Sequence, residues 1–418
     1  MAATRGSGLV AVLVVSQPVT VTTARRQSLP AKTDKRMADT VVFRGRWSRH
    51  PAVDSPARPW HVARVISLLG ETLGSLTASL YAMGHKPYRA RQIMEWVHEK
   101  RVGDFAAMTD LPAELRAQLA EKFPAATLET VRLTGSKDTT RKFLFRLPDG
   151  QFIESVFIPA SPALYGETSD RRTLCVSTQV GCAYGCKFCA SGLRGWKRNL
   201  SPGEITSQVR QVEQATGERV DNIVFMGMGE PLANWKNLSV ALEILNAPWG
   251  FEIGARHITV STSGLVPQIR ELAEHPVPVR LAISLHGATD EVREQIMPVN
   301  KKYPLGELFD ACAYFTSRRK QKLGFEYILI KDVNDSPEQA RLLAAHARRL
   351  DAKVNLIPYN TVEGLEWERP SEARQQEFVR AVRAGGVVAT IRREKGHDID
   401  AACGQLRLRV EDELAATS

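Results

Sequence analysis

Three cysteines stand close together in the chain, at Cys182, Cys186 and Cys189, in the segment Gly-Cys-Ala-Tyr-Gly-Cys-Lys-Phe-Cys. Their C-x3-C-x2-C spacing places three thiols on one loop, directly after a predicted strand. Iron–sulfur clusters are held by cysteine thiolates, and a four-iron cluster usually takes four of them. Three local ligands would leave one iron open to a small chelating molecule. The motif therefore predicts an iron–sulfur cluster with a vacant coordination position.

A structural zinc ion is the alternative for these thiols, with Cys175 or Cys403 as the fourth ligand. Zinc motifs usually consist of two closely spaced pairs of ligands, and the sequence has no second pair. The remaining cysteine, Cys312, lies on an apolar helical stripe and is predicted to belong to the core. Clustered cysteines in a chain of this length favour a metal site in a reducing compartment over a disulfide framework.

The size of the chain, 418 residues, is enough for one large α/β domain and a smaller module. Its hydrophobic content of 43% and charged content of 24% are ordinary for a globular protein. The formal net charge of +10 favours a polyanionic partner such as RNA. No apolar run approaches the length of a membrane span. We therefore expect a cytoplasmic, monomeric protein with no membrane partner.

The first part of the chain divides into three segments. Residues 1–61 lack periodicity and are predicted to be a disordered or non-native extension, with Met37 as an alternative start. Residues 62–130 are predicted to form a small helical RNA-binding module, and residues 131–171 a β extension with a turn at Pro148-Asp149-Gly150. The module has an apolar stripe and a basic face, although such charges are commonly no more than a solvated surface. The stripe is formed by Ala90, Ile93, Met94 and Val97, and the basic face by Lys86, Arg89, Arg91, Lys100 and Arg101.

Residues 172–395 alternate between apolar β-branched runs and helical patterns, and residues 396–418 form a tail. This alternation predicts parallel βαβ units and a full or partial barrel, whose functional residues lie at the C-terminal ends of the strands. The predicted strands are Thr173–Thr178, Asn222–Met226, His257–Ser261, Val279–Ser284, Phe325–Ile330, Lys353–Ile357 and Val387–Ile391. The predicted helices include Gly203–Ala215, Trp235–Leu245, Pro337–Leu350 and Ser371–Ala384.

The cysteine motif and the βα series together resemble the radical S-adenosylmethionine (SAM) superfamily. The resemblance implies a partial (β/α)6 barrel with the cluster loop after its first strand. It also implies a 4Fe-4S cluster whose open iron is chelated by SAM, which is cleaved to an adenosyl radical.

Residues 65–407 resemble more closely the bacterial dual-specificity methyltransferases that act on adenine C2 in large-subunit ribosomal RNA and in tRNA. The stretch from Ser161 to Arg172 is longer than is usual in that family. Six segments carry the resemblance: Thr173–Cys182, Val224–Leu232, Val260–Gly264, Ala282–His286, Val354–Asn360 and Asp398–Leu406.

This resemblance implies a reaction with two SAM molecules per turnover. Cys403 would be the methyl carrier, which a first SAM methylates and the radical from a second SAM activates. The resulting adduct with C2 would lose its proton to Glu154, and Cys175 would attack Cys403 to release the product through a transient disulfide. Covalent catalysis of this kind divides one difficult step into several feasible ones.

The resemblance also implies the SAM contacts and the partners. The SAM-binding residues would be Gly229, Glu230, Ser261, Ser284, Leu285, His286 and Asn360, which all lie at or after predicted strand ends. The substrates would be 23S rRNA, at the peptidyl transferase centre, and tRNA, next to the anticodon. A flavodoxin- or ferredoxin-type protein would donate the electron. Two other functions remain as alternatives: an antibiotic-resistance methyltransferase acting on adenine C8, and a zinc-stabilised RNA-binding protein without catalysis.

Overall fold

The structure is a computed structural model that describes residues 68–123, 128–137, 139–160, 170–360, 365–392 and 407–408. The predicted extension at 1–61 lies outside the described residues, and so does Cys403. Within the described ranges, no helix has the length and apolar character that crossing a membrane requires.

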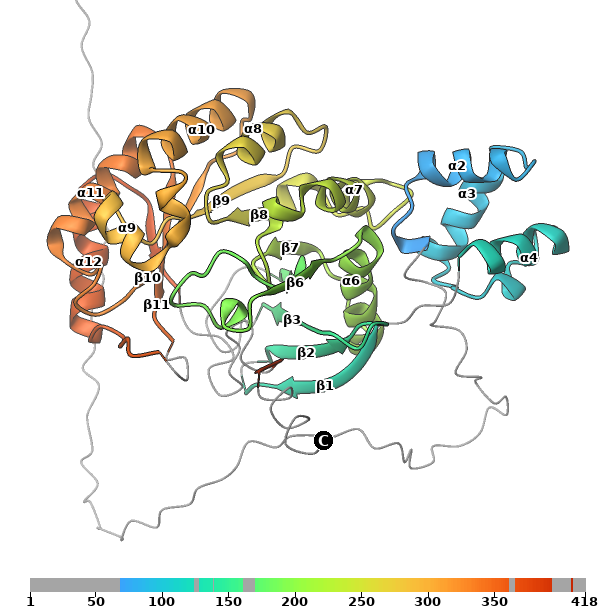
Figure 1. The fold of residues 1–418 in the computed structure, drawn as a ribbon, viewed down its shortest axis with the longest axis horizontal. Helices are drawn as coiled ribbons and strands as arrows, with labels where there is room; N and C mark the ends of the chain where they lie inside the picture. Colours follow the sequence, from blue (N-terminus) through green and yellow to red (C-terminus); the bar gives the residue numbers. More distant parts are fainter. Residues whose placement is uncertain are drawn as a thin grey trace, which may run out of the picture. The chain divides into compact units, whose positions relative to one another are not determined.

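A sheet of ten strands, counted among the described residues, organises the fold (Figure 1). Its strand order is β1-β2-β3-β4-β7-β8-β9-β10-β11-β12. Strands β1 to β4 pair antiparallel, and from β4 to β12 every pairing is parallel. The strands are Glu129–Gly135 (β1), Arg141–Arg146 (β2), Phe152–Pro159 (β3), Arg172–Cys175 (β4), Asn222–Phe225 (β7), Ile258–Thr262 (β8), Arg280–Ser284 (β9), Gly324–Leu329 (β10), Lys353–Pro358 (β11) and Ala389–Ile391 (β12). A second, two-stranded sheet joins Gln179–Gly181 (β5) to Trp196–Asn199 (β6).

Helices follow the parallel strands in six successive βα units among the described residues, from β4 with α6 to β11 with α12. This confirms the predicted partial (β/α)6 barrel and each of the predicted strands and helices, whose ends differ from the predicted ones by at most three residues. The helices are Pro202–Thr216 (α6), Trp235–Asn246 (α7), Val266–Glu274 (α8), Asp290–Ile296 (α9), Leu305–Arg318 (α10), Pro337–Arg349 (α11) and Glu372–Ala384 (α12). Short 3-10 turns lie at Ala190–Gly192, Pro231–Asn234, Ala255–His257 and Pro298–Lys301.

Local sequence signals define these helices. The first barrel helix, α6, begins with a capping box in which the Ser201 hydroxyl accepts a hydrogen bond from the Glu204 amide, while the Glu204 carboxylate accepts one from the Ser201 amide. Pro202 occupies the first helical position, and Gly217 ends the helix in the left-handed conformation.

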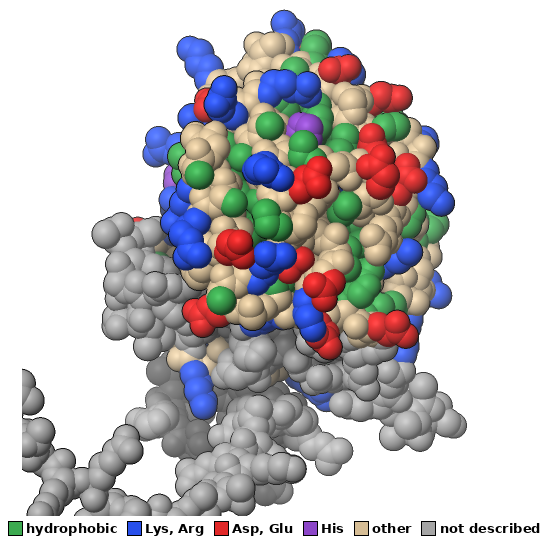
Figure 2. Space-filling view, turned by 90° about the vertical axis from the view of Figure 1, so that its left-hand side faces the viewer, with side chains coloured by type: hydrophobic (Ala, Val, Ile, Leu, Met, Phe, Trp, Pro, Cys, Tyr) green, Lys and Arg blue, Asp and Glu red, His purple; other side chains and the backbone are tan. Residues whose placement is uncertain are grey.

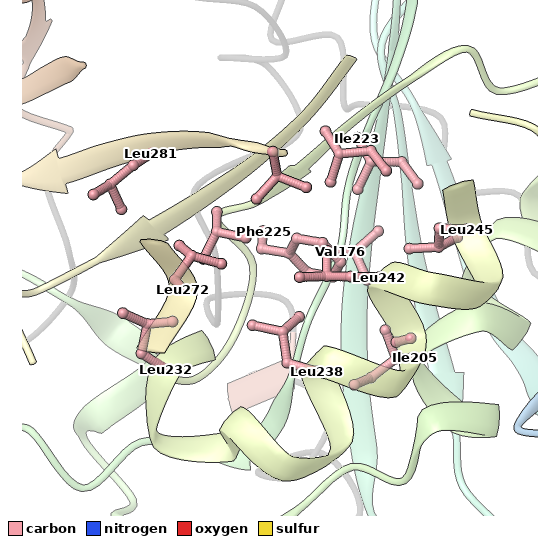
Figure 3. Packing of buried hydrophobic residues seen from close by; sticks show 14 of the residues in the cluster. Val176, Ile205, Ile223, Phe225, Leu232, Leu238, Leu242, Leu245, Leu272 and Leu281 are labelled. Carbon is pink, nitrogen blue, oxygen red and sulfur yellow. The ribbon is translucent and has the colours of Figure 1, made fainter. Parts of the chain in front are cut away.

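The core lies between the parallel strands and the helices that cover them. Figure 3 shows Val176, Ile223 and Phe225 of the strand layer packed against Leu238 and Leu242 of α7. Such interdigitated burial removes apolar surface from water, at roughly 25 cal/mol for each Å². The core also contains Cys312 on α10, which is fully buried, as the apolar stripe predicted.

The N-terminal module consists of Leu73–Ala82 (α2), Arg89–Met94 (α3), a π-helix at Glu95–Glu99, a 3-10 turn at Phe105–Ala107 and Ala113–Lys122 (α4). All four residues of the predicted apolar stripe are buried. The module is tied to α6, because the Thr206 hydroxyl donates to the Leu69 carbonyl at 2.8 Å and Arg210 donates to the Val97 carbonyl at 3.1 Å. Strand β1, which has no clear alternation, was missed by the sequence analysis.

Candidate active site

The cysteine loop is built on the β5–β6 hairpin, directly after the first parallel strand, as predicted. The Cys182 amide donates to the Gly195 carbonyl at 3.2 Å and closes the base of the loop. Gly181 has a φ of +74°, and a Cβ there would lie 1.9 Å from the Gly195 oxygen. Only glycine therefore permits this approach of the two backbone segments.

The thiols of Cys182 and Cys186 have raised pKa values. The pKa of Cys182 is raised to about 12, mainly by burial, with the nearby Cys189 and Glu230 acting in the same direction. Burial also raises the pKa of Cys186 well above its ordinary value, with the neighbouring Cys189 and Cys182 acting in the same direction. Neighbouring thiolates that share a poorly solvated loop need a cationic partner, and iron in a cluster supplies that charge. The donor set and its glycine-rich loop thus fit an iron–sulfur cluster.

Across the described ranges, no three His, Cys, Asp or Glu side chains are gathered closely enough to hold one metal ion, and this holds for the three cysteines as for the other residues.

The cysteine loop is fixed to the barrel beside β9. The Lys187 amide donates to the Ile296 carbonyl at 2.9 Å. The ring of Phe188 meets the ring of His286 edge to face, with centroids 4.8 Å apart. His286 follows the end of β9, so this contact joins the loop to the C-terminal edge of the parallel sheet.

The segment after β7 packs tightly beneath the loop. A Cβ at Gly227 would lie 2.7 Å from Ser177, and one at Gly229 would lie 2.5 Å from the Gln179 side chain. The Glu230 amide donates to the Gln179 side-chain oxygen at 2.8 Å. The two glycines therefore allow the segment that ends in Glu230 to lie against the strand that leads into the cysteine loop.

The Glu230 carboxylate is buried and held by backbone amides. Its oxygens accept from the Leu232 amide at 3.0 Å and from the Ser263 amide at 2.7 Å. Burial raises its pKa, and these hydrogen bonds act in the opposite direction. Beneath it lies a cation that the sequence analysis missed: the fully buried Arg293 donates to the Ser263 carbonyl at 2.5 Å and to the Asn300 side chain at 3.1 Å.

The predicted SAM residues on β8 and β9 come together at the same sheet edge. The hydroxyls of Ser261 and Ser284 lie 3.4 Å apart. Leu285, which follows Ser284 in the sequence, is fully buried. The Nδ1 atom of His286 accepts from the Ile328 amide at 3.0 Å, which leaves the proton on Nε2. Burial, with the nearby Arg293, lowers the pKa of His286 to about 3, so this ring is a neutral donor.

Asn360 follows the end of β11, as predicted. Its side-chain oxygen accepts from Arg369 at 2.6 Å, and the same guanidinium donates to the Tyr359 carbonyl at 2.7 Å. In the structure, the side chain of Asn360 therefore contacts Arg369.

Glu154 and Cys175 lie on adjacent strands and on the same face of the sheet. Val156 on β3 pairs with Cys175 on β4, and Glu154 is two residues from Val156. Because side chains alternate along a strand, all three face the same side, with Glu154 and Cys175 as diagonal neighbours. Both side chains are buried.

The surroundings of Glu154 include two further groups. The Lys142 ammonium on β2 lies 3.0 Å from one carboxylate oxygen, Oε2. The backbone amide of Arg407 donates to the other, Oε1, at 2.5 Å. Arg407 is four residues after the predicted methyl carrier Cys403, which itself lies outside the described residues.

Family models match the chain in two parts. The radical SAM superfamily model matches residues 176–344, and the model of the ribosomal RNA large subunit methyltransferase N-terminal domain matches residues 66–124. The protein of Akkermansia muciniphila named probable dual-specificity RNA methyltransferase RlmN is 58% identical over 346 residues, which cover 83% of this chain and 96% of the relative. The chain belongs to the RlmN family of radical SAM RNA methyltransferases.

Other RlmN relatives agree. The dual-specificity RNA methyltransferase RlmN of Anaeromyxobacter sp. strain Fw109-5 is 46% identical over 363 residues, covering 85% of this chain and 93% of the relative. The crystal structure of a radical SAM methyltransferase from Sphaerobacter thermophilus has 45% identity and a TM-score of 0.74, and the match covers 81% of this chain and 98% of that one.

Membership of the RlmN family confirms the resemblance, the fold class and the enzyme class predicted from the sequence. A 4Fe-4S cluster and SAM are the cofactors of the superfamily, and RNA is the substrate class of the RlmN enzymes. The predicted alternative of an RNA-binding protein without catalysis is therefore wrong.

Proposed function

We propose that this enzyme methylates C2 of adenine in 23S rRNA, at the peptidyl transferase centre, and in tRNA, next to the anticodon. The observation that carries the proposal is the shared sheet face of Glu154 and Cys175. A base and a resolving thiol must both reach one RNA–protein adduct, and neighbouring positions on one sheet face support these roles for Glu154 and Cys175. The dual-specificity RlmN relatives support the choice of substrates.

In this proposal the cluster would be bound by Cys182, Cys186 and Cys189. The SAM amino group would bind to Glu230, whose two amide hydrogen bonds fix its orientation. The remaining SAM contacts would be Gly229, Ser261, Ser284, Leu285, His286 and Asn360. When bound, the cluster and SAM together supply the adenosyl radical that activates the methyl carrier. Phe188, held against His286, would shield that chemistry from water.

The protein residues would then act in sequence on the RNA adduct. Cys403 would carry the methyl group, whose carbon forms the bond to C2, and Glu154 would take the C2 proton as the adduct also loses one electron. The Cys175 thiolate would then attack the Cys403 sulfur to form a transient disulfide, while the methylene carbon leaves with the electron pair of its bond to Cys403 and takes up a proton. A thiol reductant would restore the two cysteines.

The N-terminal module, residues 62–130, would bind RNA. Lys86 and Arg91 are exposed. Two tyrosines nearby in the sequence are also exposed, with 76% of the surface of Tyr81 and 52% of that of Tyr88 accessible to solvent. Cations contact phosphates, and exposed aromatic rings stack on unpaired bases. Other cations of the predicted basic face are paired within the protein: Lys100 with Glu95, and Arg101 with Glu213 of α6.

Positive charge does not dominate every face of the enzyme. On the face that carries the left-hand helices of Figure 1, Figure 2 shows Lys and Arg side chains interspersed with Asp and Glu. Such a mixed face would attract RNA weakly.

The proposal also divides the rest of the chain into three segments: a β extension at 131–171, the barrel at 172–395 and a C-terminal tail at 396–418. The enzyme would receive its electron from a flavodoxin- or ferredoxin-type protein. It would be a monomer located in the cytoplasm.

The direct test is anaerobic turnover with methyl-labelled SAM, using a 23S rRNA fragment and an unmodified tRNA as separate substrates. Digestion and nucleoside mass spectrometry should give labelled 2-methyladenosine from both RNAs. The variant Cys403→Ala, with its cluster reconstituted, is the matched control and should give none. Labelled 8-methyladenosine would replace the proposal by the C8 alternative, and label in only one RNA would refute the dual specificity.

A further inference from the structure

Lys142 is a fully buried lysine that no step of the proposed reaction uses. It lies on β2, directly opposite Val156 on β3, and Val156 is in turn opposite Cys175 on β4. The three residues therefore form one row across three strands, on the face that also carries Glu154. Neither Lys142 nor Glu154 has more than 1% of its side chain exposed.

Burying an ammonium in a strand is expensive unless a carboxylate compensates it. Here the Lys142 ammonium and the Glu154 carboxylate lie 3.0 Å apart. An exposed pair, Arg146 with Glu129, joins the same strand β2 to its other neighbour, β1. The buried pair instead fixes the direction in which the Glu154 carboxylate points.

The same carboxylate also holds the backbone of Arg407. While Oε2 contacts Lys142, Oε1 accepts the hydrogen bond from the Arg407 amide. A carboxylate that is held at one oxygen presents the other in a fixed place, and such charge-assisted hydrogen bonds are among the stronger ones. In the sequence, Arg407 is four residues after Cys403.

We propose that Lys142 is a positioning residue that holds the Glu154 carboxylate in the orientation in which it faces the adduct and accepts the Arg407 amide. The proposal rests on the assignment of Glu154 in the proposed function. Lys142 touches neither SAM nor RNA in this scheme, and it acts only through Glu154. Its loss should therefore weaken the hydrogen bond of the Arg407 amide and slow the resolution of the adduct, while SAM binding stays unchanged.

The first test measures amide hydrogen exchange at Arg407 in the full-length, cluster-loaded enzyme. Lys142→Met should speed Arg407 exchange at least tenfold, with the β3 and β4 amides within twofold of their original rates. Lys142→Arg, which keeps the charge, should restore most of the protection. Arg146→Gln breaks the exposed pair on the same strand and should leave Arg407 exchange unchanged. Unchanged Arg407 exchange in a folded Lys142→Met protein would overturn the proposal.

The second test distinguishes a positioning role of Lys142 from a general loss of folded structure. In single-turnover reactions, Lys142→Met should slow loss of the RNA–protein adduct at least tenfold, while the rate of Cys403 methylation and the separately measured Kd for SAM stay within twofold. If Lys142→Met does not fold, the double variant Lys142→Met/Glu154→Gln removes both buried charges together and should fold, with Arg407 exchange fast. An Arg407 amide still protected in that variant would also overturn the proposal.

The two proposals can fail separately. If Glu154→Gln resolves the adduct at the normal rate, Glu154 is not the base and the proposed reaction is wrong in that step. Arg407 exchange would still report whether Lys142 and Glu154 together hold the Arg407 amide.

Discussion

The carboxylate of Glu230 and the backbone amide of Ser263 are joined by a 2.7 Å hydrogen bond that links the ends of β7 and β8. The carbonyl of the same Ser263 accepts a hydrogen bond from the buried Arg293. The orientation of the carboxylate is therefore set by backbone groups and does not depend on a mobile side chain. A carboxylate fixed in this way is suited to receive the ammonium of a bound amino acid.

Glu230→Gln should weaken SAM binding by roughly tenfold or more, because an ammonium loses its counter-charge and hydrogen bonds to charged groups are worth about 1.5–3 kcal/mol. Anaerobic calorimetry with the cluster-loaded enzyme measures the Kd. The matched control is Glu326→Gln, which alters another buried barrel carboxylate that is bonded to Asn355. An equal loss of affinity in both variants would remove the specific role of Glu230.

Gly181→Ala should prevent the cysteine loop from closing, because the new Cβ would lie 1.9 Å from the Gly195 oxygen. We expect iron content after anaerobic reconstitution to fall at least fivefold, as measured by iron and sulfide analysis. Gly150→Ala is the control, since Gly150 also has a positive φ but its Cβ would meet no atom within 4 Å. Normal iron content in Gly181→Ala would contradict the packing described for the loop.

Cys175→Ala should accumulate a covalent RNA–protein adduct, because the carrier can still attack C2 but no thiol releases it. Denaturing gels of the anaerobic reaction would show the adduct as a shifted band that ribonuclease removes. Cys403→Ala should form no adduct at all. Full multiple turnover by Cys175→Ala would show that another group resolves the intermediate.

Acid should destabilise the enzyme through His98. Burial, with the nearby Arg210, lowers the pKa of His98 to about 3 from an ordinary 6.5. Between these values the unfolded chain binds a proton that the folded chain does not, so stability is full above pH 6.5 and falls as the pH is lowered toward 3.

The variant His98→Phe tests this linkage. His98 packs edge-on against Phe251, and among the described residues neither of its ring nitrogens has a hydrogen-bond partner, so a phenyl ring should fit. Thermal unfolding at pH 8 and pH 5 should show a smaller loss of Tm for the variant than for the original protein. Equal losses would mean that His98 does not contribute to the acid sensitivity.

The regular parts of the fold could be predicted because their sequences repeat with the period of their structures. Apolar β-branched runs identified the seven parallel strands, and the stripe that contains Cys312 identified a buried helix face. Strand ends then located Ser261, Ser284 and His286, since the C-terminal ends of parallel strands share one edge.

Other features depend on contacts between distant segments and left no local signal. Lys142 stands in an alternating strand pattern like a solvated lysine, and only the pairing of β2 with β3 shows that it is buried beside Glu154. Arg293 likewise looks like an ordinary helical surface residue in sequence, yet it is fully buried under Ser263. The strands β5 and β6 are too short and polar for periodicity to reveal their pairing.

The pairing of Val156 with Cys175 fixes the register of β3 and β4, which a long connection joins. The ladder of β3 and β4 alone sets how far Glu154 lies from Cys175, so the number of residues between the two strands does not enter that distance. The connection is therefore a natural place to divide the polypeptide. Two separately expressed fragments, ending after β3 and starting before β4, should reassemble along that ladder into a split enzyme whose methylation reports their association.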